Sequence, residues 1–191
     1  KFQFTKAKMV KCWLLSDNIT DTRQENHRDP KQFVSLDDLS KFGVLISHVP
    51  VSDLESGIDK LCKERGYKYR DQIVVNRKDL KNYDERVADF WQEHFHPDEE
   101  VRYIASGRGY FDVRNDKEEW VRMMLEPGDL LVLPGGIYHR FSTTMEEACY
   151  IIRLYSEVPT WTTYYRKEGG DQRQERQEYV HNYLEKQTLA T

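Results

Sequence analysis

EHFHPDEEVRYIASGRG, residues 93–109, sets two histidines one residue apart, ahead of a run of acids and a pair of glycines. Successive side chains of a β-strand point to opposite faces, so His94 and His96 share one face of an extended segment. Pro97 interrupts that segment, and a second one begins near Glu100, whose carboxylate can join the two imidazoles. The stretch therefore predicts three ligands of one metal ion, although a histidine pair at this spacing is a weak signal alone.

The other features of this stretch belong to turns. Asp98 and Glu99 are expected in a solvated turn, because runs of acids usually face water. Gly107 and Gly109 are expected to bracket a hairpin turn, with YFDVR, residues 110–114, as the returning partner strand.

A second stretch, EPGDLLVLPGGIYHRFS, residues 126–142, repeats the logic of turn, buried strand and turn. Its first turn contains Pro127 and its second turn contains Pro134, and His139 follows the second. Taken alone, His139 would be a core histidine. Read together with the first stretch, it can supply a fourth ligand from the other sheet.

The two stretches together resemble the paired signatures of the cupin superfamily. The first signature is matched at the spacing of that superfamily by His94, His96, Glu100 and Gly107, and the second by Gly128, Pro134, Gly136 and His139. Two positions depart from it: Thr143 stands where asparagine is usual, and Ala88 stands where a glycine opens the first signature. The four ligand positions are intact.

The resemblance to cupins implies a mainly β fold: an antiparallel β-barrel of the jelly-roll type, with flanking N-terminal helices and a C-terminal helix. We expect one cupin domain over residues 9–168 and a helical tail over 169–191. Residues 1–8 are expected to be a native extension or a remnant of cloning. The sequence pattern agrees with a β-barrel, because short runs rich in Val, Ile, Tyr and Phe alternate with turns between residues 94 and 164.

Three helices are predicted before the barrel, from capping residues and apolar spacing. They cover residues 35–43, 52–66 and 82–94, with capping boxes opened by Ser35, Ser52 and Asn82. The third helix is expected to run directly into His94.

Within the cupins, the stretch from residue 90 to 141 is similar to the central segment of the acireductone dioxygenases of methionine salvage, and similarity extends over about residues 9–166. Departures inside it are modest: Phe95 and Pro97 replace a leucine and a polar residue, and Tyr155 stands where phenylalanine is common. The resemblance implies one Fe(II) or Ni(II) ion per chain, with acireductone and O2 as substrates. It also implies that the iron form yields 4-methylthio-2-oxobutanoate and formate, whereas the nickel form yields methylthiopropionate, formate and carbon monoxide.

The ligand chemistry agrees with this implication without selecting the metal. Three neutral imidazoles and one carboxylate carry a formal charge of −1, so a divalent ion keeps a net charge of +1. An octahedral ion would retain two open positions for a bidentate enediolate. Iron, nickel, copper and zinc all accept imidazole ligands.

Arg102 lies two residues beyond Glu100, on the same face of a regular strand, and is assigned to neutralising the anionic substrate. The alternative is a salt bridge to Glu100 or Glu99. The resemblance places Phe90, Ile104 and Phe141 around the substrate; ordinary core packing is the alternative for these three. The remaining histidines are predicted to be non-ligands, namely His27, His48 and His181.

Composition and charge narrow the classes of function that the chain could have. The formal net charge is −4, and no block of Lys and Arg is long enough to follow a nucleic-acid backbone. No apolar run approaches the ~20 residues needed to span a bilayer, and the three cysteines are expected to be reduced thiols rather than a disulfide framework.

We expect a monomer in the cytoplasm, with the nucleus as a second location. Two alternatives stay open: a metal-binding cupin with other chemistry, such as an isomerase or an inert zinc protein, and a module whose helices bind a partner protein.

Overall fold

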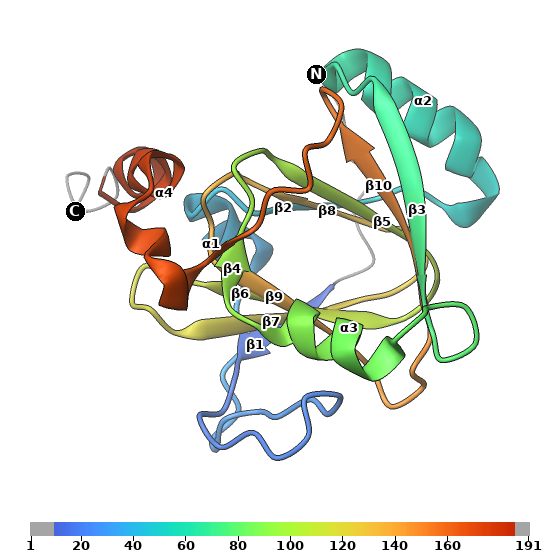
Figure 1. Cartoon of the computed structure of the whole chain (residues 1–191). Coiled ribbons are helices and arrows are strands. Elements are labelled where there is room, and N and C mark those ends of the chain that lie inside the picture. Colours follow the sequence, from blue (N-terminus) through green and yellow to red (C-terminus); the bar gives the residue numbers. More distant parts are fainter. Residues whose placement is uncertain (1–9, 186–191) are drawn as a thin grey trace.

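The computed structural model describes residues 10–185, so the expectation for residues 1–8 lies outside the described part. Two antiparallel sheets face each other and form a barrel (Figure 1). The six-stranded sheet has the order β1-β7-β6-β9-β4-β11, with bounds Lys11–Leu14 (β1), Trp120–Leu125 (β7), Gly109–Arg114 (β6), His139–Thr143 (β9), His94–Phe95 (β4) and Tyr164–Tyr165 (β11).

The five-stranded sheet has the order β2-β8-β5-β10-β3, with bounds Leu45–His48 (β2), Asp129–Leu133 (β8), Glu100–Gly107 (β5), Cys149–Tyr155 (β10) and Tyr69–Val75 (β3). The inward faces of the two sheets meet in one apolar cluster, in which Ile104, Leu131 and Ile151 from this sheet join Phe111 and Phe141 from the other. Alternation along each strand thus fills the barrel with side chains. The predicted barrel architecture is confirmed.

Helix α2 (Leu54–Arg65) covers the outer face of the five-stranded sheet (Figure 1). Its buried side chains, Ile58 and Leu61, pack against outward-facing residues of that sheet, and Gly66 ends the helix in the left-handed conformation with φ 76°. The predicted stop is therefore confirmed. The predicted start at Ser52 is wrong, because a 3₁₀ turn, η1 (Val51–Asp53), precedes the helix and its N-cap makes no side-chain hydrogen bond.

The other two predicted helices differ in how well their starts agree with the sequence pattern. Helix α1 (Leu36–Lys41) begins as expected, with the Ser35 side chain accepting a hydrogen bond from the Asp38 amide. Helix α3 (Tyr83–Trp91) follows Asn82, which is left-handed and makes no capping hydrogen bond. It ends at Trp91 instead of running into His94, because Gln92 is already extended.

The predicted hairpin around Gly107 and Gly109 is wrong. Strands β5 and β6 belong to different sheets, and β6 pairs with β7 and β9 instead. Gly107 has φ 71°, and a Cβ there would lie 2.1 Å from the Ala148 carbonyl oxygen, so only glycine allows the chain to leave one sheet for the other at this point. Strands β2 and β3 had no counterpart in the sequence prediction.

The C-terminal segment packs against one end of the barrel. It contains the short helices η2 (Arg166–Glu168), η3 (Gly170–Gln172) and α4 (Gln174–Tyr179), followed by the π-helical turns η4 (Val180–Glu185). The Tyr179 hydroxyl donates to the Phe42 carbonyl at 3.0 Å, and Arg176 donates to the Gly136 carbonyl at 3.1 Å. Through residue 185 the tail is therefore part of the packed structure. No helix within residues 10–185 is both long and apolar enough to cross a bilayer.

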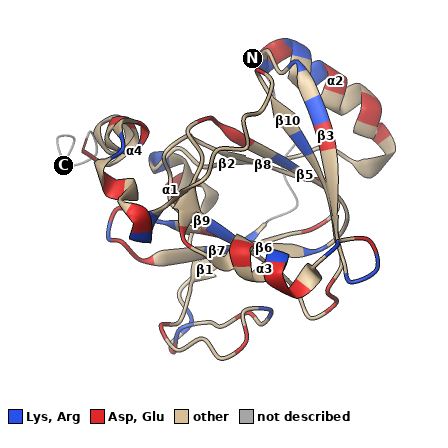
Figure 2. Ribbon diagram, viewed as in Figure 1, with Lys and Arg blue, Asp and Glu red and all other residues tan. Residues whose placement is uncertain are grey.

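Charged residues of both signs mix on the outer helices. Figure 2 shows acidic and basic positions interspersed along α2, whereas α3 is mainly acidic with a basic position among the acidic ones. The outward face of the six-stranded sheet differs, because it buries an ion cluster. Asp112 is fully buried and accepts hydrogen bonds from Arg122 at 2.7 and 2.9 Å and from Arg140 at 3.0 Å.

This cluster attaches the long loop after β1 to the sheet. Arg122 also donates to the carbonyl oxygens of Thr22 and Gln24, and the Arg140 guanidinium lies 3.6 Å from the centre of the Trp91 ring and 4.0 Å from that of Trp120. One carboxylate thus compensates two arginines in a nearly dry environment. Removing a single partner from such a site is costly, because the remaining charges stay buried.

We expect Asp112→Asn to lower the free energy of unfolding by about 3–5 kcal/mol, because two buried guanidinium groups lose their counter-charge. Urea denaturation followed by circular dichroism measures the change. The matched control is Asp116→Asn in the exposed 115–119 turn, which should shift stability by less than ~0.5 kcal/mol. Equal stability of the two variants would show that the cluster contributes little.

Candidate metal centre

The pairing of β4 with β9 places His94 and His139 opposite each other in one sheet, so the expectation that His139 comes from the other sheet is wrong. His94 is the register partner of His139, and their ring centroids lie 4.4 Å apart. His96 follows on the same side of the chain, with its ring 5.2 Å from that of His94 and 5.4 Å from that of His139. The donor nitrogens of the three imidazoles lie within 4.8 Å of one another. The three predicted histidine ligands are thus together in the structure.

Each imidazole is oriented by a backbone carbonyl that sequence reasoning could not locate. The Nδ1 atoms of His94, His96 and His139 contact the carbonyl oxygens of residues 92, 162 and 137 at 2.7, 2.8 and 3.1 Å respectively. A carbonyl can only accept, so Nδ1 carries the proton in each ring. In a neutral imidazole with this tautomer, Nε2 is unprotonated and available to a metal ion, as in other histidine-ligated metal sites.

Glu100 brings a carboxylate to these nitrogens. Its Oε2 atom lies 3.2 Å from His96 Nε2 and 3.3 Å from His139 Nε2. Ligands in adjacent octahedral positions at ~2.1 Å from an ion are ~3 Å apart, so these separations suit a shared metal. Oε2 is fully buried and makes no well-directed hydrogen bond within the described chain. The fourth predicted ligand therefore lies beside two of the three histidine nitrogens.

The protonation states match those that metal binding requires. Burial, aided by the neighbouring imidazoles, lowers the pKa of His94 to about 3, and burial also lowers the pKa of His96. For Glu100, burial alone would raise the pKa, but the Arg102 guanidinium and the histidines outweigh it and bring it well below its ordinary value. Near neutral pH the site holds neutral His94 and His96 rings beside a carboxylate, and this donor set fits a divalent transition metal.

Arg102 contacts the ligand set directly. Its Nη2 atom lies 2.8 Å from Glu100 Oε2, and its side chain is largely buried at the edge of the cavity. Arg102 thus forms the salt bridge to Glu100 that was considered as the alternative, and it also lines the cavity. Glu99 is not its partner: it is exposed in the turn before β5, as expected, where it binds Arg65 at 2.8 Å and accepts a short hydrogen bond from the Tyr67 hydroxyl.

A cavity of about 480 Å³ opens next to the four ligand candidates. Phe90 and Phe141 line it and pack edge to face, with ring centroids 6.1 Å apart. Ile104, which the family resemblance placed beside the substrate, is instead fully buried in the barrel interior and does not line the cavity. Several further residues line the cavity and were not predicted from the sequence, namely Ile73, Ile151, Arg153, Tyr155 and Trp161.

The sequence pattern does indicate that three of these lining residues share one face of a strand. Ile151, Arg153 and Tyr155 alternate along β10, so one face of that strand points toward the cavity. Alternation alone could not show which face of β10 points toward the cavity, because that depends on where the neighbouring strands lie. None of the predicted non-ligands lines the cavity; they lie beside acidic groups, with His27 at Glu25, His48 at Asp129 and His181 at Glu185.

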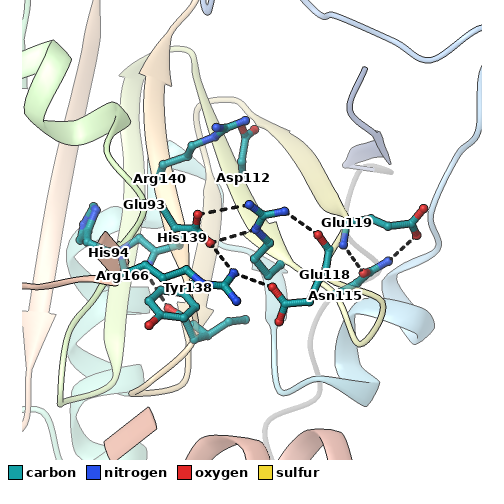
Figure 3. Close-up of polar contacts among 12 residues, drawn as sticks. Glu93, His94, Asp112, Asn115, Glu118, Glu119, Tyr138, His139, Arg140 and Arg166 are labelled. Carbon is teal, nitrogen blue, oxygen red and sulfur yellow. Dashed lines mark hydrogen bonds and ion pairs between the residues drawn. The ribbon is translucent and has the colours of Figure 1, made fainter. Parts of the chain in front are cut away.

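An ion-pair network holds Glu93, the residue that precedes strand β4 and its ligand candidate His94 (Figure 3). Glu93, the neighbour of His94, binds Arg114 at 2.9 Å and Arg166 at 3.0 Å, and Arg166 reaches Glu118 at 2.5 Å. Strand β11 adds a backbone pairing of Tyr165 with His94. The short strand that carries His94 is therefore held from both neighbouring strands and through the side chain that precedes its ligand.

Comparisons with known proteins show the family to which the chain belongs. The model of the ARD/ARD′ family matches residues 11–163. Acireductone dioxygenase 2 of Arabidopsis thaliana is 40% identical over 181 residues, which cover 94% of this chain and 93% of that protein. The acireductone dioxygenase of Branchiostoma floridae is 41% identical over 174 residues, with 90% of this chain and 96% of that protein covered.

A solved structure shows the same fold. It is an acireductone dioxygenase from Bacillus anthracis with a cadmium ion in its active centre, and it superposes with a TM-score of 0.68 at 24% identity, over 83% of this chain and 99% of that chain. The extent of the family match and the identity to its relatives decide the assignment. This chain belongs to the ARD/ARD′ family of acireductone dioxygenases.

Proposed function

We propose that this chain cleaves the acireductone 1,2-dihydroxy-3-keto-5-methylthiopentene with O2 in the methionine salvage pathway. The observation that carries the proposal is the convergence of three Nε2 atoms and one carboxylate at the edge of a 480 Å³ cavity that also contains an arginine. Such a volume is in the range of small-molecule sites. The curated relatives named acireductone dioxygenase support the same substrate.

The proposed metal ligands are His94, His96, Glu100 and His139, with one Fe(II) or Ni(II) ion per chain. When bound, the ion would act as a Lewis acid and a template for the enediolate oxygens. The donor set accepts either metal, because imidazole and carboxylate ligands suit both. We propose that the iron form gives 4-methylthio-2-oxobutanoate and formate, and that the nickel form gives methylthiopropionate, formate and carbon monoxide.

The residues of the chain supply recognition and electrostatics. Arg102, beside Glu100 in the cavity, stabilises the negative charge of the ionised substrate. Phe90 and Phe141 form an apolar wall for the methylthio end and exclude water from it. We propose that the working unit is a monomer. We also propose that the enzyme acts in the cytoplasm, with the nucleus as a second location.

We expect protein reconstituted with Fe(II) to consume acireductone and O2 together, observed as loss of substrate absorbance and oxygen uptake. Product analysis should detect carbon monoxide with Ni(II) and not with Fe(II). A metal-binding cupin with other chemistry would bind the ion yet leave the substrate unchanged under air, and that result would reject the proposal.

Glu100→Gln should weaken Fe(II) and Ni(II) binding at least tenfold, because it removes a charged ligand from a site of low polarity. Elemental analysis after dialysis and oxygen uptake measure the two losses. Glu64→Gln on the exposed face of α2 is the control and should keep a full equivalent of metal. Full metal occupancy in Glu100→Gln would remove Glu100 from the ligand set.

Arg102→Gln should keep the metal but lower kcat/KM by about 10²-fold, because a preorganised positive charge is lost from the substrate site. Steady-state kinetics on metal-loaded protein test this expectation. Arg70→Gln, which breaks an exposed pair with Glu55, serves as the control. Normal turnover in Arg102→Gln would reduce Arg102 to a structural partner of Glu100.

A further inference from the structure

One lining residue of the cavity carries a polar group for which the described chain offers no partner. The hydroxyl of Tyr155 is buried from solvent and makes no hydrogen bond with any residue between 10 and 185. A buried hydroxyl without a partner is unfavourable, and such groups in native proteins usually have a ligand or an ordered water as their partner. The missing partner of Tyr155 is therefore the question to answer.

The position of Tyr155 limits what that partner can be. Leu154 of β10 pairs with Val101 of β5, and the two strands are antiparallel. Tyr155, one residue further along β10, therefore lies across from Glu100, one residue earlier on β5. Tyr155 shares the cavity-facing side of β10 with Ile151 and Arg153. The hydroxyl therefore belongs to a ring that stands next to the metal centre, on the strand adjacent to its carboxylate ligand.

The ring is held in place by two neighbours. Trp161 packs edge to face against it, with centroids 5.5 Å apart and planes at 76°, and the guanidinium carbon of Arg102 lies 6.0 Å from the ring centre. Little rotational freedom has to be lost when a ligand meets a group that is already fixed, so the contact can contribute most of its intrinsic strength.

The chemistry of the hydroxyl selects an acceptor. Tyrosine is protonated at neutral pH, and burial raises the pKa of Tyr155 further, so the group offers a hydrogen to an electron-rich oxygen. The enediolate form of an acireductone carries such oxygens at adjacent carbons. Arg102, on the neighbouring strand, supplies positive charge to the same region of the cavity.

We propose that the Tyr155 hydroxyl donates a hydrogen bond to an oxygen of the bound acireductone, so that Tyr155 is a substrate-binding residue in addition to Arg102. This inference rests on the function proposed above. It predicts that the hydroxyl matters for substrate affinity and not for the fold or for metal binding, because within the described chain it holds nothing else.

Tyr155→Phe in the metal-loaded full chain tests the proposal, because it deletes one oxygen and keeps the ring. Anaerobic titration with acireductone should give a Kd about threefold to tenfold higher than that of the unmodified protein, and kcat/KM in air should fall by a similar factor. Metal content should be unchanged, and the melting temperature should not fall, since no native hydrogen bond is lost.

Tyr69→Phe is the matched control. Tyr69 is the register partner of Tyr155 on β3, is 42% exposed and does not line the cavity, so its Kd and kcat/KM should equal those of the unmodified protein. Equal acireductone affinity in Tyr155→Phe and the unmodified protein would overturn the inference and assign the hydroxyl to water. A loss of stability or metal in Tyr155→Phe would also overturn it. If the unmodified protein itself fails to bind acireductone, the proposed function falls and this inference with it.

Discussion

The pairing of His94 with His139 is the interaction on which the site depends. It joins β4, a strand of only two residues, to β9 and so connects the first histidine stretch to the second. A strand this short has little pairing energy of its own. Its position is secured by β11 on the other side and by the ion pairs of Glu93 with Arg114 and Arg166 (Figure 3). Much of the surrounding structure thus holds one short strand in register.

The same constraint explains the electrostatic state of the centre. Burial keeps the imidazoles of His94 and His96 neutral, and Arg102 helps to keep the Glu100 carboxylate ionised. Backbone carbonyls accept hydrogen bonds from the Nδ1–H groups, so the Nε2 atoms face the shared site without further rearrangement. One of these carbonyls belongs to Thr162, in the segment after β10 that also carries Trp161 to the cavity. The loop that lines the cavity therefore also orients a ligand.

The sequence, read with its resemblance to the cupins, predicted the barrel and a set of four candidate ligands, but not several of their surroundings. Alternation alone put His94 and His96 on one face, and the resemblance to the paired cupin signatures added Glu100 and His139. The change of sheet at Gly107 was read as a hairpin, since a glycine turn looks the same whether the next strand pairs with the previous one or leaves it. Ile104 shares a face with Arg102, yet it lies deeper in the barrel, and depth is not encoded in alternation. Contacts between distant segments, such as Glu99 with Tyr67, leave no local pattern at all.

In the proposed site, one metal ion is held by His94, His96, Glu100 and His139 together. Anomalous X-ray diffraction from crystals of the Fe(II)- or Ni(II)-loaded protein, with data collected on both sides of the absorption edge of that metal, locates the ion. We expect a single strong peak at ~2.0–2.2 Å from the three Nε2 atoms and from one Glu100 oxygen. A peak bound through Nδ1, a peak that lacks Glu100, or a peak at another site in the molecule would contradict it.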